Sequence, residues 1–165
     1  MELKVALLPF ASSNLVLLKS WLARGHVSRW YPEPDENLQW AASPPSGGDH
    51  ALIAANEIIV GYLRWQVVDR KTLDSVGLTE IPSGAVDIDI LLGEYQHVGQ
   101  GVGPAALDAL VLRLSADPEL SVAGLTSAAD NIHAHSAFEK AGFRMTLLYS
   151  PPGYGPCHLF LRQLR

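Results

Sequence analysis

Residues 85–116 pass from a strand through a glycine-rich turn into a helix, and this unit limits the possible folds more than any other segment. Alternation over residues 85–92 places Val86, Ile88, Ile90 and Leu92 on one face of a strand and Asp87, Asp89 and Leu91 on the other. Helical spacing follows over residues 101–116, where one face carries Leu107, Leu110, Val111 and Leu114. A half-covered strand that leads into an amphipathic helix indicates a sheet with helices packed on it.

The rest of the chain also mixes strand and helix patterns. The expected strands are residues 3–10, 51–55, 58–68, 85–92, 122–125, 143–149 and 157–164; the expected helices are residues 12–24, 101–116 and 131–141, with short broken helices over 26–40. We expect Ser12 or Ser13 to cap the first helix, Gly25 to end it, and residues 69–83 to form a loop. This order predicts one α+β domain over residues 1–165, with a mixed, mostly antiparallel central sheet flanked by helices.

Composition excludes several classes of protein. The chain is 48% hydrophobic and 18% charged, which is typical of a folded globular domain. A net charge of −5 without a basic patch disfavours nucleic acid and membranes as partners and favours a cationic small molecule. The first residues lack signal-peptide features and no apolar stretch is long enough to cross a bilayer, so we expect a cytoplasmic protein, monomeric or homodimeric. Cys157 is the only cysteine, which excludes a disulfide framework and a thiolate metal cage.

Asp87 and Asp89 are candidates for the chemistry. Two carboxylates two residues apart along a strand lie about 6.5–7 Å from each other. In a partly covered cleft, mutual repulsion and loss of hydration would raise at least one pKa, which suits a general base or a group that holds an ammonium ion. A solvated strand face is the alternative interpretation of the same two residues.

The turn over residues 96–103, Gln-His-Val-Gly-Gln-Gly-Val-Gly, indicates an anion site. Alternate glycines let the backbone turn sharply and approach a ligand, and free N–H groups at the helix start converge on one point. Pro104 has no N–H, so residues 98–103 would supply the donors for a pyrophosphate. A P-loop is not indicated, since no Gly-Lys-Ser/Thr follows, and the parallel strand series of a dinucleotide-binding fold is missing.

Together with residues 131–143, which run from Asn131 through Phe138-Glu139-Lys140-Ala141-Gly142-Phe143, these segments resemble the GCN5-related N-acetyltransferases (GNAT). The glycine turn is similar to that family's coenzyme A pyrophosphate loop, and residues 131–143 are similar to its second coenzyme A motif. The resemblance implies an N-acetyltransferase that uses acetyl-coenzyme A as co-substrate and no metal. The residues it implies at coenzyme A are Leu91, Leu92, Val98, Gly99, Gln100, Gly101, Val102, Gly103, Asn131, Ala134, Phe138 and Lys140.

A closer resemblance is to the aminoglycoside 6′-N-acetyltransferases, carried by residues 21–30, 61–62, 88–89 and 117–120. In those relatives the aspartate that matches Asp89 lies at the acceptor amine. Asp89 is therefore the expected proton acceptor, with Asp87 as the second candidate. Phe138 replaces a tyrosine often proposed to protonate the departing thiolate, and Tyr149 and Tyr95 are the possible substitutes.

The resemblance implies that the acceptor is a primary amine of a small cationic molecule, an aminoglycoside being one possibility. The expected substrate-binding residues are Trp30, Tyr31, Glu80, Thr126 and Tyr154, of which Thr126 and Tyr154 fall where the aminoglycoside enzymes have acidic residues. Trp40, Trp65, Glu33, Asp35 and Glu36 are further candidates, although aromatic residues at these spacings also form cores. Acetylation of a siderophore precursor, a polyamine or a protein N-terminus is an alternative function, and a coenzyme A-binding sensor without turnover is another.

Overall fold

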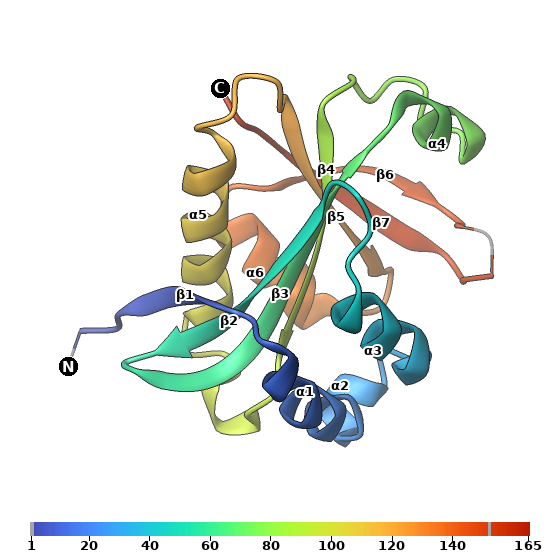
Figure 1. Cartoon of the computed structure of the whole chain (residues 1–165). Coiled ribbons are helices and arrows are strands. Elements are labelled where there is room, and N and C mark those ends of the chain that lie inside the picture. Colours follow the sequence, from blue (N-terminus) through green and yellow to red (C-terminus); the bar gives the residue numbers. More distant parts are fainter. Residues whose placement is uncertain (1, 152) are drawn as a thin grey trace.

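Figure 1 shows the computed structural model, which describes residues 2–151 and 153–165. Within these residues the sheet has seven strands in the order β1-β2-β3-β4-β5-β7-β6. The strands are β1 (Val5–Pro9), β2 (Gly48–Ala55), β3 (Ile58–Val68), β4 (Ala85–Leu92), β5 (Val122–Ala128), β6 (Arg144–Tyr149) and β7 (Cys157–Gln163). Every neighbouring pair is antiparallel except β4 and β5, which run parallel. The predicted mixed, mostly antiparallel sheet is therefore confirmed.

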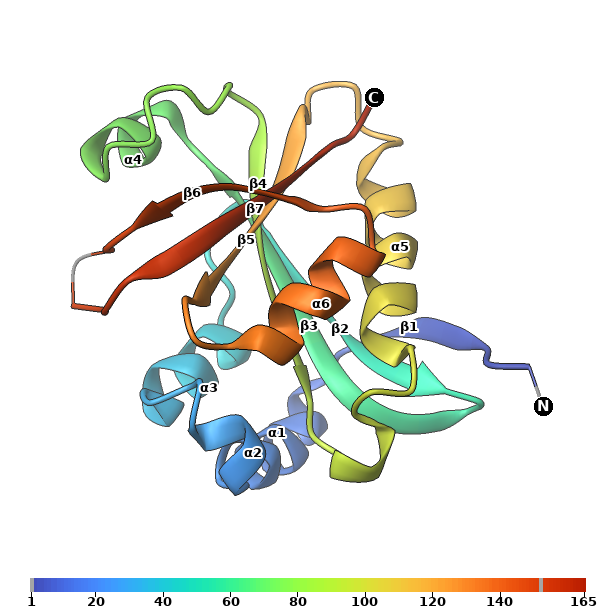
Figure 2. The same cartoon turned by 180° about the vertical axis from the view of Figure 1, so that it is seen from behind.

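Helices cover the two faces of this sheet in different ways. The helical segments are η1 (Ser12–Asn14), α1 (Leu15–Leu22), α2 (Gly25–Ser28), α3 (Pro34–Ala42), α4 (Arg70–Ser75), η2 (Tyr95–His97), α5 (Val102–Leu114) and α6 (Ile132–Lys140). Helices α5 and α6 pack on one face and bury the main core there (Figure 2). On the opposite face, one apolar cluster joins the sheet to α1–α3, and a separate one joins it to α4.

The first helix differs from the prediction at both ends. Neither Ser12 nor Ser13 caps it; instead the N–H of Ala11 donates to Oδ1 of Asn14 at 2.8 Å across a single 3₁₀ turn. Gly25 does not end the helix but begins α2, because the extended backbone of Arg24, at φ −75° and ψ 137°, already separates the two helices. No left-handed glycine is needed at that break.

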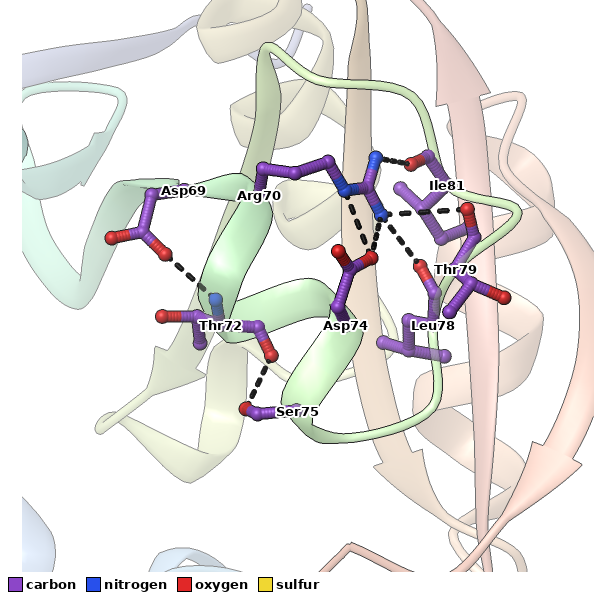
Figure 3. A network of polar contacts seen from close by, with 8 residues as sticks. All are labelled: Asp69, Arg70, Thr72, Asp74, Ser75, Leu78, Thr79 and Ile81. Carbon is purple, nitrogen blue, oxygen red and sulfur yellow. Dashed lines mark hydrogen bonds and ion pairs between the residues drawn. The ribbon is translucent and has the colours of Figure 1, made fainter.

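The predicted loop over residues 69–83 is also wrong in part, because it contains α4. Asp69 caps this helix by accepting the N–H of Thr72 at 2.7 Å. The Arg70 guanidinium forms an ion pair with Asp74 at 2.8 Å and donates to the carbonyl of Ile81 at 2.6 Å, which ties the returning chain to the helix (Figure 3). Helix α4 has only six residues and is stabilised by hydrogen bonds between side chains and the backbone. So short a helix has too few apolar positions for sequence periodicity to predict it.

Trp21 on α1 fixes the end of β4. Its ring is fully buried, and its Nε1 donates to Oε1 of Glu94 at 3.0 Å. Arg24 donates to the carbonyl of Gly93 and to Oε2 of Glu94, both at 2.8 Å, and the hydrogen bonds from Trp21 and Arg24 lower the pKa of Glu94. A Cβ at Gly93 would lie only 2.0 Å from Cγ of Trp21, so only glycine allows this contact.

We expect Gly93→Ala to lower the free energy of unfolding by about 1–3 kcal/mol or more, the usual cost of overpacking, because the added methyl group must displace the Trp21 ring. The measurement is urea unfolding followed by tryptophan fluorescence. Gly25→Ala is the control, since its Cβ would meet no atom within 4 Å and Gly25 has no positive φ. Equal unfolding midpoints for Gly93→Ala and the wild type would contradict this account of the contact.

Candidate active site

The parallel strands β4 and β5 are paired over only part of their length. Their register runs from Ala85 opposite Val122 to Ile88 opposite Leu125. Beyond that point residues 89–92 follow β3, while residues 126–128 follow β7, so that β5 extends past its predicted end at Leu125. The two strands therefore diverge and leave an opening between their C-terminal halves.

The backbone of β4 presents polar groups to this opening. Leu91 pairs with β3, and the N–H of Gly93 donates to the carbonyl of Val60 on the same strand at 2.8 Å. Successive residues of a strand direct their N–H and C=O groups to opposite edges, so those of Ile90 and Leu92 face the opening. Leu91 and Leu92 were both predicted at coenzyme A; the structure directs the backbone polar groups of Leu92 to the opening and those of Leu91 toward β3.

Side chains from α2 and the segment after it satisfy the two carbonyls at this edge. The hydroxyl of Tyr31 donates to the Ile90 carbonyl at 2.8 Å. Nε2 of His26 lies 2.8 Å from the Leu92 carbonyl and must carry the proton there, because a carbonyl only accepts. The N–H groups of Ile90 and Leu92 face no neighbouring strand at this edge, and they can bind a carbonyl oxygen of a ligand.

The glycine turn connects the end of β4 to α5. Gly99 and Gly101 have φ of 78° and 86°, in the left-handed region that favours glycine. The N–H of Val98, which was predicted to donate to the pyrophosphate, donates to the Tyr95 carbonyl at 3.0 Å instead. Within the described residues, the N–H groups of residues 99–103 donate to no backbone carbonyl. They therefore remain available to an anion at the start of α5, and Pro104, which follows them, has no N–H.

The second predicted motif begins α6, which packs beside α5. Asn131 caps the helix through its Oδ1, which accepts the N–H of Ala134 at 3.4 Å. Phe138 is buried with its ring centroid 5.3 Å from that of Phe160, whereas Lys140 is exposed. Val102, at the start of α5, is buried in the main core. Asn131 and Phe138 thus have structural contacts that are complete without a ligand.

A hollow of about 940 Å³ lies on the face of the sheet opposite α5 and α6. It is bordered by the two apolar clusters of that face, and polar or small residues occupy the strand positions between them: Arg64, Gln66, Asp87, Asp89, Gly124 and Thr126. Its charged lining consists of Glu33, Glu36, Asp69, Asp87, Asp89 and Arg64. With five carboxylates against one guanidinium, the hollow is suited to a cation with several charges.

Most of the residues predicted at the acceptor come together in this hollow. It is lined by Asp87, Asp89, Trp30, Tyr31, Thr126 and Tyr154, and also by Trp40, Glu33 and Glu36. Glu80 and Asp35 are not among its lining residues, and Trp65 lies in the main core, where Arg113 stacks 5.1 Å from its ring centroid.

Two of the charged lining residues, Arg64 and Asp69, were not predicted from the sequence. Arg64 lies opposite Asp89 on β3, and the alternation of β3 places it on the face away from buried Leu63. The sequence shows this alternation, but it does not show that Arg64 pairs with Asp89. Asp69 was missed because the helix that it caps was missed.

Cys157 begins β7, within the strand predicted over residues 157–164, and is buried. It is 7% exposed, and burial raises the pKa of its thiol, which disfavours the thiolate. The described residues, 2–151 and 153–165, contain no group of three or more His, Cys, Asp or Glu side chains arranged to hold a metal ion. They also contain no helix with the length and apolar character needed to span a bilayer.

The family model described as "Acetyltransferase (GNAT) domain" matches residues 11–148, and the chain belongs to this family of N-acetyltransferases. Among characterised relatives, it is 26% identical over 150 residues to the aminoglycoside N(6')-acetyltransferase type 1 of Klebsiella pneumoniae. The match covers 85% of this chain and 74% of that relative. The enzyme of the same name from Serratia marcescens gives the same values.

Solved structures show the same fold. Aminoglycoside acetyltransferase AAC(6')-Ib in complex with coenzyme A and kanamycin superposes with a TM-score of 0.80 at 23% identity, covering 98% of this chain and 95% of that one. An uncharacterised protein from Bacillus halodurans gives a TM-score of 0.84 at 17% identity, over 98% of this chain and 84% of that one. The predicted acyltransferase fold and the resemblance to the GNAT family are both confirmed.

Proposed function

We propose that this chain transfers an acetyl group from acetyl-coenzyme A to a primary amine of a small polycation, with the 6′-amine of an aminoglycoside as the first candidate. The observation that carries this proposal is the position of the acidic hollow beside the opening between β4 and β5. A thioester in the opening and an amine in the hollow would meet along the second half of β4. The Klebsiella pneumoniae and Serratia marcescens relatives, both named for aminoglycoside N(6')-acetylation, support the choice of acceptor.

The glycine turn supports the coenzyme A part of the proposal. The free N–H groups of residues 99–103 stand at the N-terminus of α5, a helix of 13 residues whose dipole adds positive potential for a pyrophosphate. From there the opening leads along the edge of β4, where an extended pantetheine chain can bond to the backbone as an added strand would. The N–H groups of Ile90 and Leu92 are the donors we assign to the thioester carbonyl and its oxyanion.

The charge of the hollow supports the acceptor part. Carboxylates from α3 and the residue before it, from the residue before α4 and from β4 surround the space, and they attract and orient a polycation. Two carboxylates that the aminoglycoside enzymes carry are absent at Thr126 and Tyr154, but Glu33, Glu36 and Asp69 supply charge from other elements. Holding the amine next to the thioester converts a bimolecular reaction into a positioned one, which is a large part of the expected acceleration.

Tyr149 is the better placed of the two tyrosines considered for the leaving group. It lines the hollow, its hydroxyl lies 2.8 Å from Oγ1 of Thr126, and loss of hydration raises its pKa, so the phenol stays protonated. Tyr95 is 69% exposed on η2 and makes an edge-to-face ring contact with His26 instead. The departing thiolate belongs to a thiol whose pKa is about 8.5, so it needs little protonation to leave. Tyr149 could donate a proton to it only from the hollow that this residue lines.

We expect Gly99→Ala to raise the dissociation constant of coenzyme A about tenfold, measured by isothermal titration calorimetry, because an alanine Cβ disfavours the left-handed turn by about 1–2 kcal/mol. Gly77→Ala is a matched control. Both glycines have a positive φ, 78° and 81°, and a Cβ at either would meet no atom within 4 Å. The same strain at Gly77 should lower stability and leave coenzyme A affinity unchanged. Equal affinity losses in the two variants would show that strain alone acts, and not the loss of the anion site.

The acceptor is tested by thiol release from acetyl-coenzyme A with kanamycin, tobramycin, spermidine, a hydroxylysine siderophore precursor and a short peptide, each product being weighed for a single acetyl group. We expect rapid release with the aminoglycosides. Turnover with another amine alone would show that the acceptor proposed here is wrong and that the acetyl-transfer reaction is right. Coenzyme A binding without turnover of any amine would favour the non-catalytic sensor.

A pair of charge-neutralising variants shows whether the acceptor uses the hollow. Glu36→Gln removes a carboxylate that lines it, and we expect the KM of a polycationic acceptor to rise about two- to fivefold, on the scale of one partly screened charge pair. Glu119→Gln removes a carboxylate elsewhere on the surface and should leave KM unchanged. An equal effect of both changes would indicate attraction by net charge alone.

A further inference from the structure

The two aspartates of β4 have different partners. Asp89 lies opposite Arg64 on β3, and Nε of Arg64 donates to its Oδ2 at 3.2 Å. Asp87 lies opposite Gln66 on β3 and opposite Gly124 on β5. Within the described residues the carboxylate of Asp87 has no hydrogen bond or ion pair, and Gly124 has no side chain that could cover it. Only Asp89 therefore has a charge partner in place.

Arg64 is held where it is by packing as well as by charge. Its Cζ lies 4.7 Å from the ring centroid of Trp40, which stacks it as a cation on an aromatic face. The Trp40 ring fills the space over Gly48, where a Cβ would come within 2.9 Å of it. The Arg64 side chain is only 21% exposed, so its guanidinium is already ordered before any ligand binds.

The neighbour of Trp40 adds no second positive charge. The ring centroid of His50 lies 5.8 Å from that of Trp40, and Nδ1 of His50 lies 2.8 Å from the hydroxyl of Tyr62. Burial lowers the pKa of His50, so the ring stays neutral. Arg64 is thus the one cation that faces the two aspartates among the lining residues of the hollow.

We propose that Asp87 accepts the proton of the reacting ammonium group, and that Asp89 with Arg64 is a positioning pair. This inference rests on the proposed function. The ammonium group gives one proton to Asp87, and the nitrogen lone pair then forms the C–N bond at the thioester carbonyl. The C–S bond breaks with its electron pair on sulfur, and the second excess proton moves from nitrogen to the thiolate.

The electrostatics of the hollow agree with this division. Loss of hydration raises the pKa of Asp87, the negative charge of Asp89 raises it further, and Arg64 opposes the shift. Asp87 is nevertheless open to the hollow, which an amine must enter to reach it. The other titratable or charged groups that face the same space are Tyr31, Glu33, Glu36, Asp69, Tyr149, Tyr154 and Cys157. A carboxylate with a raised pKa is a better proton acceptor near neutral pH than an ordinary one.

The test is the pH dependence of kcat in four proteins: the wild type, Asp87→Asn, Asp89→Asn and Arg64→Gln. Thiol release is measured with two acceptors whose amines differ in pKa. A rising limb of the pH profile that occurs at the same pH with both acceptors reports a group of the enzyme and not the amine. The base acts when deprotonated, so wild-type kcat should rise with pH through a pKa above that of an ordinary carboxyl. Asp87→Asn should abolish this limb and lower kcat by about 100-fold or more.

The other two variants should move the limb in opposite directions. Asp89→Asn removes a negative charge that disfavours ionisation of Asp87, so the limb should shift to lower pH and persist. Arg64→Gln removes a positive charge that favours ionisation, so the limb should shift to higher pH. Loss of the limb in Asp89→Asn with its retention in Asp87→Asn would overturn the proposal and make Asp89 the base.

Failure of the proposed function can be told apart from failure of this inference. Absence of wild-type turnover with every amine refutes the function. The inference then rests on a carbon-13 NMR titration of the aspartate carboxyl groups, with the Asp87 signal assigned by its loss in Asp87→Asn. A raised pKa of Asp87 that falls in Asp89→Asn and rises further in Arg64→Gln supports the division of roles. An ordinary carboxyl pKa at Asp87 overturns it, whether or not the enzyme turns over.

Discussion

The parallel pairing of β4 with β5 stops at Ile88 and Leu125, and the rest of the site depends on that stop. A continued ladder would have used the N–H groups of Ile90 and Leu92 within the sheet. Because the strands diverge, those groups face an opening that an extended ligand can enter as a further strand. The glycine turn begins at the end of the same strand, so the proposed anion site and the proposed carbonyl-binding edge follow one another along the chain.

The second requirement is a face of the sheet that apolar side chains leave uncovered. Helices α1–α3 and α4 each bury their own cluster, and between them the strands carry Arg64, Asp87 and Asp89. Burial there would have cost several kcal/mol for each unpaired charge, so the middle of the face stays open. The resulting excess of carboxylates favours the binding of a polycation. Arg64 forms an ion pair with Asp89, so the carboxylate of Asp87 is the one that remains available to the ligand.

Much of the site could be predicted from the sequence because its parts are local. Alternation over residues 85–92 predicted that both aspartates lie on one face, and the glycine turn predicted the start of α5. The ion pair of Asp89 with Arg64 could not be predicted, because the two residues are 25 positions apart and meet only through the register of β3 with β4. Helix α4 and the break at Arg24 were missed because side-chain bonds and one extended residue, not apolar periodicity, determine them.

A crystal structure with coenzyme A and kanamycin bound tests the central claim most directly. The account predicts the pyrophosphate within hydrogen-bonding distance of the N–H groups of residues 99–103 and the sulfur in the opening beside residues 90–92. It also predicts an amine of the acceptor in the hollow, closer to Asp87 than to Asp89. Coenzyme A bound outside the opening, or an acceptor bound away from the carboxylates of the hollow, would contradict it.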